Sequence, residues 1–420
     1  MNINAKGLAV VIIIAGAAVV AAYNFGMSEA QKQQTTMAPG MPATVQNPPP
    51  EAAAAPKALL PEGAVMPANH PPTGGAAPRF THFQVGNRNV KGMLADGDEV
   101  WVGTSGGAIR YSLKTEDYKV YDVNNHSLIS NGVFHISKLR NKIMVGTYGG
   151  GMSVYDPQTD KWKNYNIPDG MADQFVYDIG EDEQGNFWIA TWSGVNLVAG
   201  GNLDDPSGWT TYTVENTKGG LPNDWVYGVE IGKNHDVWFA TEGGLARLDK
   251  DRQWTHWKHE DGLGAPYEKV KDDIAFTNDP AQASKHHAMQ KAEQGLADVK
   301  VGYNPNYIVS IAVDDKGVVW CGTWGGGLSR FDGTSWQTYT TKEGLPGNHV
   351  FMLKQAKDGK LWIGTNKGLA RFKDDGQGFV VMTKEQGLYA DNVFSMTEAA
   401  DGSLWIGSFG GVARLSNYNL

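Results

Sequence analysis

A short strand pattern, Trp-x-Gly-Thr with small variations, recurs along most of the chain and constrains the fold more than any other feature. The second positions of successive copies lie 43, 44, 50, 82, 42 and 43 residues apart. A period near 43 residues with several short strands in each unit is typical of β-propeller blades. The seven copies occupy residues 100–104, 143–147, 187–191, 237–241, 319–323, 361–365 and 404–408.

A second repeated element is a pair of large apolar residues three positions apart. One pair, Phe80 and Phe83, precedes the first strand pattern, and no pair follows the last. We therefore expect residues 80–83 to supply the outermost strand of the last repeat, which would close the ring and leave no open sheet edge. The other pairs are Tyr118/Tyr121, Trp162/Tyr165, Trp209/Tyr212, Trp254/Trp257, Trp336/Tyr339 and Phe379/Met382.

These repeats predict an all-β fold, a seven-bladed β-propeller over residues 80–420 that is closed by an N-terminal strand. The composition agrees, because 53 glycines, 14 tryptophans and 16 tyrosines favour many short strands joined by turns. The net charge of −9, from 36 basic and 45 acidic residues, argues against nucleic acid as a partner. The single cysteine, Cys321, excludes a disulfide framework within the chain and a four-cysteine zinc site.

The first residues of the chain predict a membrane signal. Residues 7–22 carry no charge and follow Lys6. They fit a signal-anchor transmembrane helix over residues 1–23, or a signal peptide cleaved after Ala22, and either places the remainder outside the cytoplasm. Residues 24–79 hold 11 of the 19 prolines and neither Trp nor Tyr, which predicts a disordered Pro/Ala-rich linker. We expect an inner-membrane anchor with the propeller in the periplasm, or a secreted propeller if cleavage occurs.

The best copies of the repeat, residues 344–372 and 387–415, begin with Gly-Leu and continue into the strand pattern. Over residues 80–420 the chain resembles the two-component regulator propeller family, whose unit has the form GLPxNxV followed by DGxLWIGTxxGLxRF. The resemblance implies an extracytoplasmic, ligand-sensing propeller. No second membrane span, histidine kinase or output domain follows in this sequence, so we expect the sensing or docking part alone.

In such a propeller, two sets of connections share one face around the central channel. One set joins the second and third strands of each blade, and the other joins the outermost strand of a blade to the innermost strand of the next. Aromatic residues are frequent in both sets, and rings around a shared hollow suit stacking on a sugar or capping an apolar side chain. The alternative is that the rings pack between blades. The predicted ligand-binding residues are Tyr148, Trp192, Glu242, Trp324 and Phe409 after the strand pattern, and Phe175, Trp225, Tyr307 and His349 before the next innermost strand.

The spacing of 82 residues marks an insertion over residues 265–305. A helix is predicted over residues 280–294, with Asn278 or Asp279 as its N-cap, Pro280 in its first turn and Gly295 after its end. On the channel face, this insertion would act as a lid or a partner-docking element. The alternative is a surface elaboration, because long loops cost little stability.

The sequence predicts no catalytic residue, cofactor or metal site. His286 and His287 are neighbours about 100° apart on a helix, and positions 290 and 291 offer no ligand for an i, i+4 metal pair. One enzymatic hypothesis remains, because residues 237–244 are similar to repeats of the streptogramin B lyases, which use metal-assisted elimination. Its candidates are His349, His135 and Glu242.

We interpret the chain as a membrane-tethered extracytoplasmic β-propeller that performs no catalysis of its own. Its expected partner is a small carbohydrate or peptide ligand, or a protein of the cell envelope. A ligand sensor should use the aromatic residues at the channel mouth, whereas a docking module should use the insertion.

Overall fold

The computed structural model describes residues 79–274, 279–374 and 376–416. The transmembrane helix expected over residues 1–23 lies outside these ranges, as does all but the last residue of the linker expected over residues 24–79. Of the helices within the described ranges, none is both long and apolar enough to span a bilayer.

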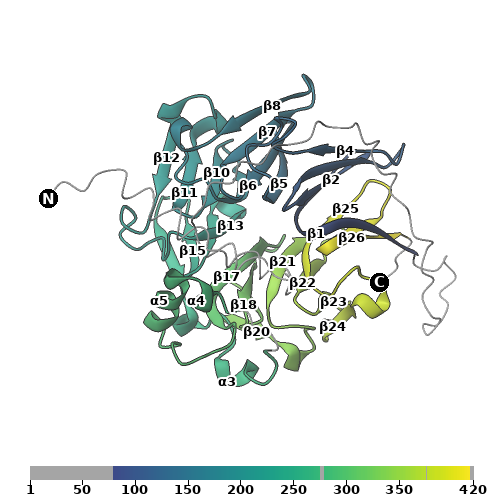
Figure 1. Cartoon of the computed structure of the whole chain (residues 1–420). Helices are drawn as coiled ribbons and strands as arrows, with labels where there is room; N and C mark the ends of the chain where they lie inside the picture. Colours follow the sequence, from purple (N-terminus) through teal and green to yellow (C-terminus); the bar gives the residue numbers. More distant parts are fainter. Residues whose placement is uncertain (1–78, 275–278, 375, 417–420) are drawn as a thin grey trace, which may run out of the picture.

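Six antiparallel sheets stand around a central axis (Figure 1). Five of them have four strands each. In each of these five sheets, the strand that comes first in the chain lies nearest the axis. The strands of these five sheets are β5 (Val133–Leu139), β6 (Lys142–Thr147), β7 (Met152–Asp156) and β8 (Lys161–Tyr165); β9 (Val176–Glu181), β10 (Phe187–Thr191), β11 (Gly194–Val198) and β12 (Trp209–Tyr212); β13 (Val226–Ile231), β14 (Val237–Thr241), β15 (Gly244–Leu248) and β16 (Trp254–Trp257); β17 (Asn304–Val313), β18 (Val319–Trp324), β19 (Leu328–Phe331) and β20 (Trp336–Tyr339); and β21 (Val350–Gln355), β22 (Leu361–Thr365), β23 (Gly368–Phe372) and β24 (Phe379–Met382).

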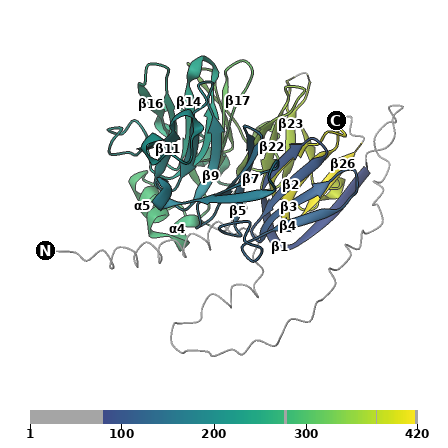
Figure 2. The same cartoon turned by 90° about the horizontal axis from the view of Figure 1, so that it is seen from above.

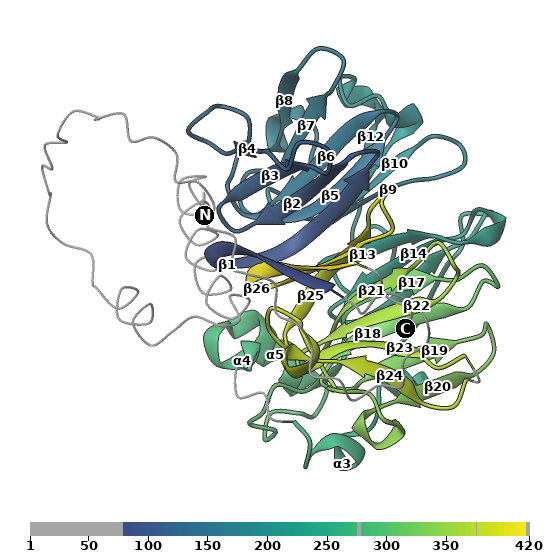
Figure 3. The ribbon, with the colours of Figure 1, turned by 90° about the vertical axis from the view of Figure 1, so that its right-hand side faces the viewer.

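The sixth sheet has six strands and joins the two ends of the described chain. Its order is β25-β26-β1-β2-β3-β4. Residues 79–84 of β1 pair with β26, and residues 90–96 of β1 pair with β2 (Figure 3). Its strands are β1 (Arg79–Asp96), β2 (Glu99–Thr104), β3 (Gly107–Ser112), β4 (Tyr118–Tyr121), β25 (Val393–Glu398) and β26 (Leu404–Ser416).

The prediction of seven separate blades is therefore wrong. The structure has five four-stranded blades and one wider sheet, in which the expected first and last blades are continuous. The reason is the length of two strands. β1 has 18 residues and runs without a break from the closing position into the first repeat, and β26 has 13 residues and covers two expected strand positions of the last repeat.

The repeated threonine and glycine of the strand pattern close the hairpin between the second and third strands. The Thr191 hydroxyl donates a hydrogen bond of 2.7 Å to the Gly194 carbonyl oxygen, and five other copies form the same bond. Gly194 has a φ of +102°, and a Cβ atom there would lie 2.2 Å from the Tyr212 carbonyl oxygen. Only glycine fits this close approach of two backbones.

The core lies between neighbouring sheets, where the tryptophans of the strand pattern are buried. Trp188 is 1% exposed and its ring centre lies 5.6 Å from that of Phe239 in the next sheet. Trp101 and Trp405 are also 1% exposed and hold the equivalent position in their repeats. The repeat period thus places a buried tryptophan ring at this position in six of the seven repeats, and Met144 takes the position in the other.

The connections between strands contain short 3₁₀ helices, several of which are capped by their own side chains. Thr340 and Thr383 each begin such a helix, and each forms a capping box with the residue three positions later. The 3₁₀ helices are η1 (Ile167–Asp169), η2 (Ala199–Gly201), η3 (Pro206–Gly208), η4 (Lys233–His235), η5 (His259–Asp261), η6 (Thr341–Glu343) and η7 (Lys384–Gln386).

The insertion carries three short helices, α3 (Tyr267–Val270), α4 (Pro280–Ala283) and α5 (Lys285–Glu293). The region expected to form one helix is divided at Ser284, whose φ of −132° and ψ of 127° are extended. Asp279 caps α4, and its carboxylate forms a buried ion pair of 2.5 Å with Lys291 on α5. Figure 2 shows α4 and α5 at one end of the sheets, below the strands β9 and β11 in this view.

Cys321 should be chemically inert in the folded chain. It lies in the middle of β18 with no exposed surface, and burial raises the pKa of its thiol well above the ordinary value, so the reactive thiolate is scarce. We expect no reaction with Ellman's reagent at pH 8 under native conditions and one reacting thiol per chain in 6 M guanidinium, measured by absorbance. Rapid native labelling would contradict the burial of this side chain.

Candidate functional site

Each innermost strand contains one residue that the antiparallel pairing skips. In β5, for example, Val133 pairs with Thr147 and His135 with Gly146, so Phe134 has no partner position. A β-bulge of this kind turns the skipped side chain away from the ladder. These residues form what we call the axial belt, which lines the cavity on the central axis: Lys91, Phe134, Tyr177, Tyr227, Val309, Phe351 and Phe394.

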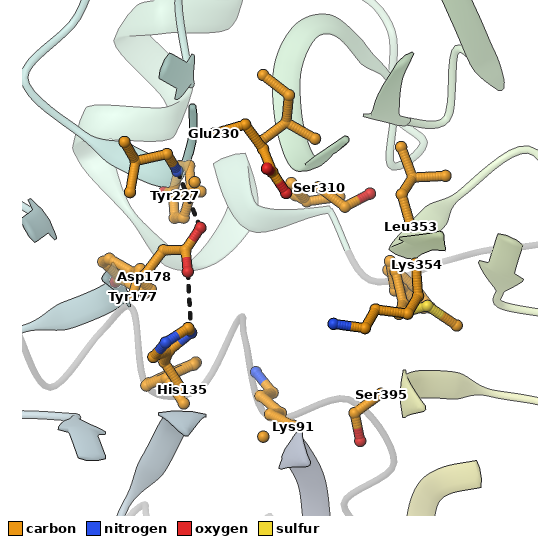
Figure 4. A pocket seen from close by; sticks show the side chains of 18 of the residues that line it. Lys91, His135, Tyr177, Asp178, Tyr227, Glu230, Ser310, Leu353, Lys354 and Ser395 are labelled. Atoms are coloured by element: carbon orange, nitrogen blue, oxygen red, sulfur yellow. Dashed lines mark hydrogen bonds and ion pairs between the residues drawn. The ribbon is translucent and has the colours of Figure 1, made fainter. Parts of the chain in front are cut away.

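The axial cavity has a volume of about 480 Å³, which is within the range of small-molecule sites. Five aromatic rings of the belt form part of its wall. Polar side chains reach the same hollow from other positions of the innermost strands (Figure 4). They are His135, Asp178, Glu230, Ser310, Lys354 and Ser395.

Four of the predicted mouth residues form one continuous aromatic series beside the belt. The ring centres of Tyr148 and Phe175 are 4.5 Å apart, those of Phe175 and Trp192 are 4.6 Å apart, and those of Trp192 and Trp225 are 4.5 Å apart, all edge to face. Tyr148 also contacts Phe134 of the belt at 5.3 Å. Sequence reasoning therefore selected residues that the fold brings together.

Three other predicted residues lie deeper, under the insertion. Tyr307 stacks on Trp324 at 5.3 Å, and both side chains are at most 2% exposed. The Nε2 atom of His349 lies 2.6 Å from the Gly302 carbonyl oxygen, and burial lowers the pKa of His349 to about 4. The ring is therefore neutral at physiological pH, and its Nε2–H group donates this bond.

Phe409, the remaining predicted ring, is half-buried at the edge of the same aromatic cluster. Its residue pairs with Asn89 where β26 meets β1. This ring thus marks the point at which the six-stranded sheet reaches the channel mouth.

Glu242 joins the mouth to the insertion. Its fully buried carboxylate accepts a hydrogen bond from Nδ1 of His287 on α5, and its Oε2 atom lies 3.6 Å from Nε2 of His286. The ring of His286 in turn stacks on Trp225, with centres 3.6 Å apart. Burial lowers the pKa of His286. These contacts hold α5 over one side of the channel mouth.

The polar groups within the cavity are held in a partly desolvated environment. The Nδ1 atom of His135 lies 2.9 Å from a carboxylate oxygen of Asp178, which also accepts a hydrogen bond of 2.9 Å from the Val229 amide. Burial, aided by the charge of Asp178, raises the pKa of Glu230 to about 8. Burial also lowers the pKa of Lys91, whose Nζ lies 4.5 Å from the ring centre of Phe134.

Sequence reasoning missed the axial belt, although a signal for it is present. One set of predicted residues precedes the first valine or isoleucine of each innermost strand, whereas the belt residue comes directly after it. Glu230 and Lys354 were also missed. Each lies four positions after the buried valine, Val226 or Val350, in a strand that is otherwise mainly apolar. A charged residue at this position, near the end of an innermost strand, could have been noticed.

The residues of the lyase hypothesis are held by separate partners. His135 binds Asp178, His349 binds Gly302, and Glu242 binds His287. Within the described ranges, no group of three or more His, Cys, Asp or Glu side chains could hold a metal ion.

The substitution Glu242→Gln should loosen the insertion. A charge-assisted hydrogen bond is about twice as strong as a neutral one, so the neutral amide holds His287 and His286 less firmly. We expect amide exchange in α4 and α5 to accelerate about tenfold, measured by hydrogen–deuterium exchange and mass spectrometry. Glu260→Gln, at an exposed carboxylate of η5, is the matched control. Equal exchange in both variants would contradict the assigned role of Glu242.

The comparisons with known proteins agree with the repeat pattern. The two component regulator propeller family matches residues 170–193, 302–325 and 344–367. No curated protein matches the chain at a significant level. Several solved structures share the fold.

The extracellular domain of a putative hybrid two component system from B. thetaiotaomicron is 21% identical, with a TM-score of 0.61 over 81% of this chain and 41% of that chain. A second such domain from B. thetaiotaomicron is 18% identical, with a TM-score of 0.58 over 82% of this chain and 43% of that one. The chain thus spans about two fifths of their length. A catalytically inactive virginiamycin B lyase from Staphylococcus aureus is 11% identical, with a TM-score of 0.55 over 81% of this chain and 100% of the lyase.

At these identities the structural likeness shows the fold alone, whereas the family match rests on the sequence of the repeats themselves. It confirms the resemblance predicted from the strand pattern and the Gly-Leu-Pro turns. Three segments of this chain, residues 170–193, 302–325 and 344–367, thus match two component regulator propeller repeats.

Proposed function

We propose that the chain is an extracytoplasmic ligand-sensing module that binds a small molecule in the axial cavity and performs no catalysis. One observation carries the proposal: seven bulged residues, five of them aromatic, are directed to a single cavity of about 480 Å³. Bulges cost ladder hydrogen bonds, and their repetition around one hollow favours a binding role over a packing role.

The proposed location rests on two supports. Two solved relatives with this fold are extracellular domains of putative hybrid two component systems. The uncharged residues 7–22 after Lys6 also favour export and a membrane tether. We propose that residues 1–23 anchor the chain and residues 24–79 act as a spacer for the propeller.

The predicted mouth residues complete the proposed site. Tyr148, Phe175, Trp192 and Trp225 present a second set of rings next to the belt, and rings of this kind can stack on a sugar or enclose an apolar side chain. Tyr307, Trp324 and His349 would act as supports, since they are almost fully buried. Glu242 would control the position of α5 over the entrance.

Thermal unfolding of the full chain in detergent, with and without maltotriose, L-phenylalanine or glycyl-L-phenylalanine, tests this proposal. A ligand at 100 times its Kd stabilises the folded state by about 2.7 kcal/mol, which corresponds to a rise in Tm of a few degrees. We expect at least one probe to raise Tm, and Phe351→Ala to abolish the rise. Tyr118→Ala, 50% exposed on β4, is the control. No rise with any probe, or a rise that Phe351→Ala leaves unchanged, would contradict the proposal.

Docking of an envelope protein is the second candidate, because α5 exposes an apolar side chain at the channel face. Met289 on α5 is 62% exposed. If the chain is a docking module, Met289→Glu should abolish stoichiometric co-purification with one membrane protein, while the three small probes leave Tm unchanged. Ligand binding and docking thus give opposite results in the same two assays.

A further inference from the structure

The acidic and basic side chains that line the axial cavity lie on different sides of it. Asp178 on β9 and Glu230 on β13 form an acidic side, and Lys91 on β1 and Lys354 on β21 form a basic side. Figure 4 shows Glu230, Lys354 and Lys91 reaching into the hollow from different sides. The acidic and the basic side chains of the cavity therefore lie on different sides of the axis.

The acidic half has spare capacity to accept hydrogen bonds. Asp178 already receives bonds from His135 and from the Val229 amide. Glu230, by contrast, receives no hydrogen bond from any residue in the part of the chain that the structure describes. Each carboxylate oxygen can accept two hydrogen bonds, so Glu230 offers several acceptor positions to a ligand.

Burial disfavours the charged forms of two groups in the cavity. Burial favours the neutral form of Glu230, whose pKa rises to about 8, and it also favours the neutral form of Lys91. Lys354 is exposed, and its charge partly offsets the rise in the pKa of Glu230. A ligand with both charges would compensate both halves at once.

Resting on the proposed function, we propose that the ligand is a zwitterion, an α-amino acid or a short peptide with free termini. Its ammonium group would face Asp178 and Glu230, and its carboxylate would face Lys91 and Lys354. Its side chain would lie against the aromatic rings of the axial belt. Ser310 and Ser395, whose hydroxyls already bond to backbone carbonyls, would line the space between the two charged halves.

Calorimetric titration of the full chain at pH 7.5 with matched probes tests this inference. L-Phenylalanine has both charges, phenethylamine has only the ammonium group, and 3-phenylpropanoate has only the carboxylate. We expect L-phenylalanine, or the dipeptide glycyl-L-phenylalanine, to bind at least tenfold more tightly than either singly charged probe. A singly charged probe that binds as tightly as both zwitterions would overturn the inference.

Two charge variants give a readout that a structural role would not produce. Glu230→Gln should weaken L-phenylalanine about tenfold and leave 3-phenylpropanoate unchanged, whereas Lys354→Met should weaken L-phenylalanine and leave phenethylamine unchanged. Glu215→Gln and Lys357→Met, at exposed positions, are the controls. A variant that changes all three affinities by the same factor would also overturn the assignment.

The probes separate this inference from the proposed function. If maltotriose binds and no phenyl probe does, the zwitterion inference fails and the sensing function stands. If neither maltotriose nor any phenyl probe binds, both fail.

Discussion

The substitution Phe80→Ala should destabilise the folded chain by about 3–5 kcal/mol, the range for removal of a buried phenylalanine ring. Phe80 is 4% exposed, pairs with Leu415 of β26, and packs on Leu388 and Leu404. Its ring also covers Gly387, where an added Cβ atom would lie 2.3 Å from it. The measurement is urea unfolding followed by tryptophan fluorescence, with the free energy of unfolding extrapolated to water.

The effect should extend beyond the cavity that the substitution leaves. Residues 79–84 make most of the pairing between β1 and β26, so a weakened contact there exposes an open sheet edge on both strands. We expect amide exchange to accelerate in residues 412–415 of β26 as well as in residues 80–84. The control Tyr118→Ala removes a half-exposed ring from β4 and should cost less than about 1 kcal/mol. Equal losses in the two variants would show that the β1–β26 contact has no special role.

The sequence predicts the strands of this fold better than it predicts how they join into sheets. The aromatic pairs such as Tyr118/Tyr121 and Phe379/Met382 do lie on the outermost strands β4 and β24. The merging of two blades was not predictable, because it depends on whether residues 85–89 continue β1 or interrupt it. That choice is made by the twist and pairing of the surrounding strands, and not by the local sequence.

For the candidate site, too, some features could be predicted from the sequence and others could not. Turn position and residue type identified Trp192 and Trp225, but burial of Tyr307 and Trp324 depends on the insertion that covers them. The axial belt depends on β-bulges, which are defined by pairing register and therefore appear only when both strands are placed. The partner of His287 proved to be Glu242, which is 45 residues away in the sequence. No local spacing rule could have found this contact.

Replacement of Glu230 by Gln should make the chain more stable at pH 8 and leave its stability nearly unchanged at pH 4. The carboxyl group has a pKa of about 8 in the folded chain and an ordinary value of 4.5. Between these values the unfolded chain has released this proton and the folded chain retains it, so the stability contributed by this group falls as pH rises. It is fully present below pH 4.5 and is lost by about pH 8.

The size of this effect follows from the shift. Each pH unit of the window changes the free energy of unfolding by about 1.4 kcal/mol, which gives a difference of about 3–5 kcal/mol between the ends of the window. Gln has nearly the same shape and does not titrate, so the difference in stability between Glu230→Gln and the parent chain should grow with pH. Urea unfolding of both chains at pH 4, 6 and 8 measures it. Other titrating groups are common to both chains and cancel in the difference, and Glu215→Gln should show no such trend.

If the difference in stability between Glu230→Gln and the parent chain does not change with pH, Glu230 is not desolvated in the folded chain. The proposed ligand site would then lose part of its physical basis. If the trend is found, the same substitution must have two opposite consequences. It should raise stability, because a poorly solvated carboxyl group is gone, and it should weaken L-phenylalanine binding, because the carboxylate that would face the ammonium group is gone. A residue that lowers stability in the empty protein and raises affinity for a ligand is expected at a binding site and not in a structural core. Measured together, the two effects therefore distinguish a cavity that binds a ligand from a channel that is only the unfilled centre of a ring of sheets.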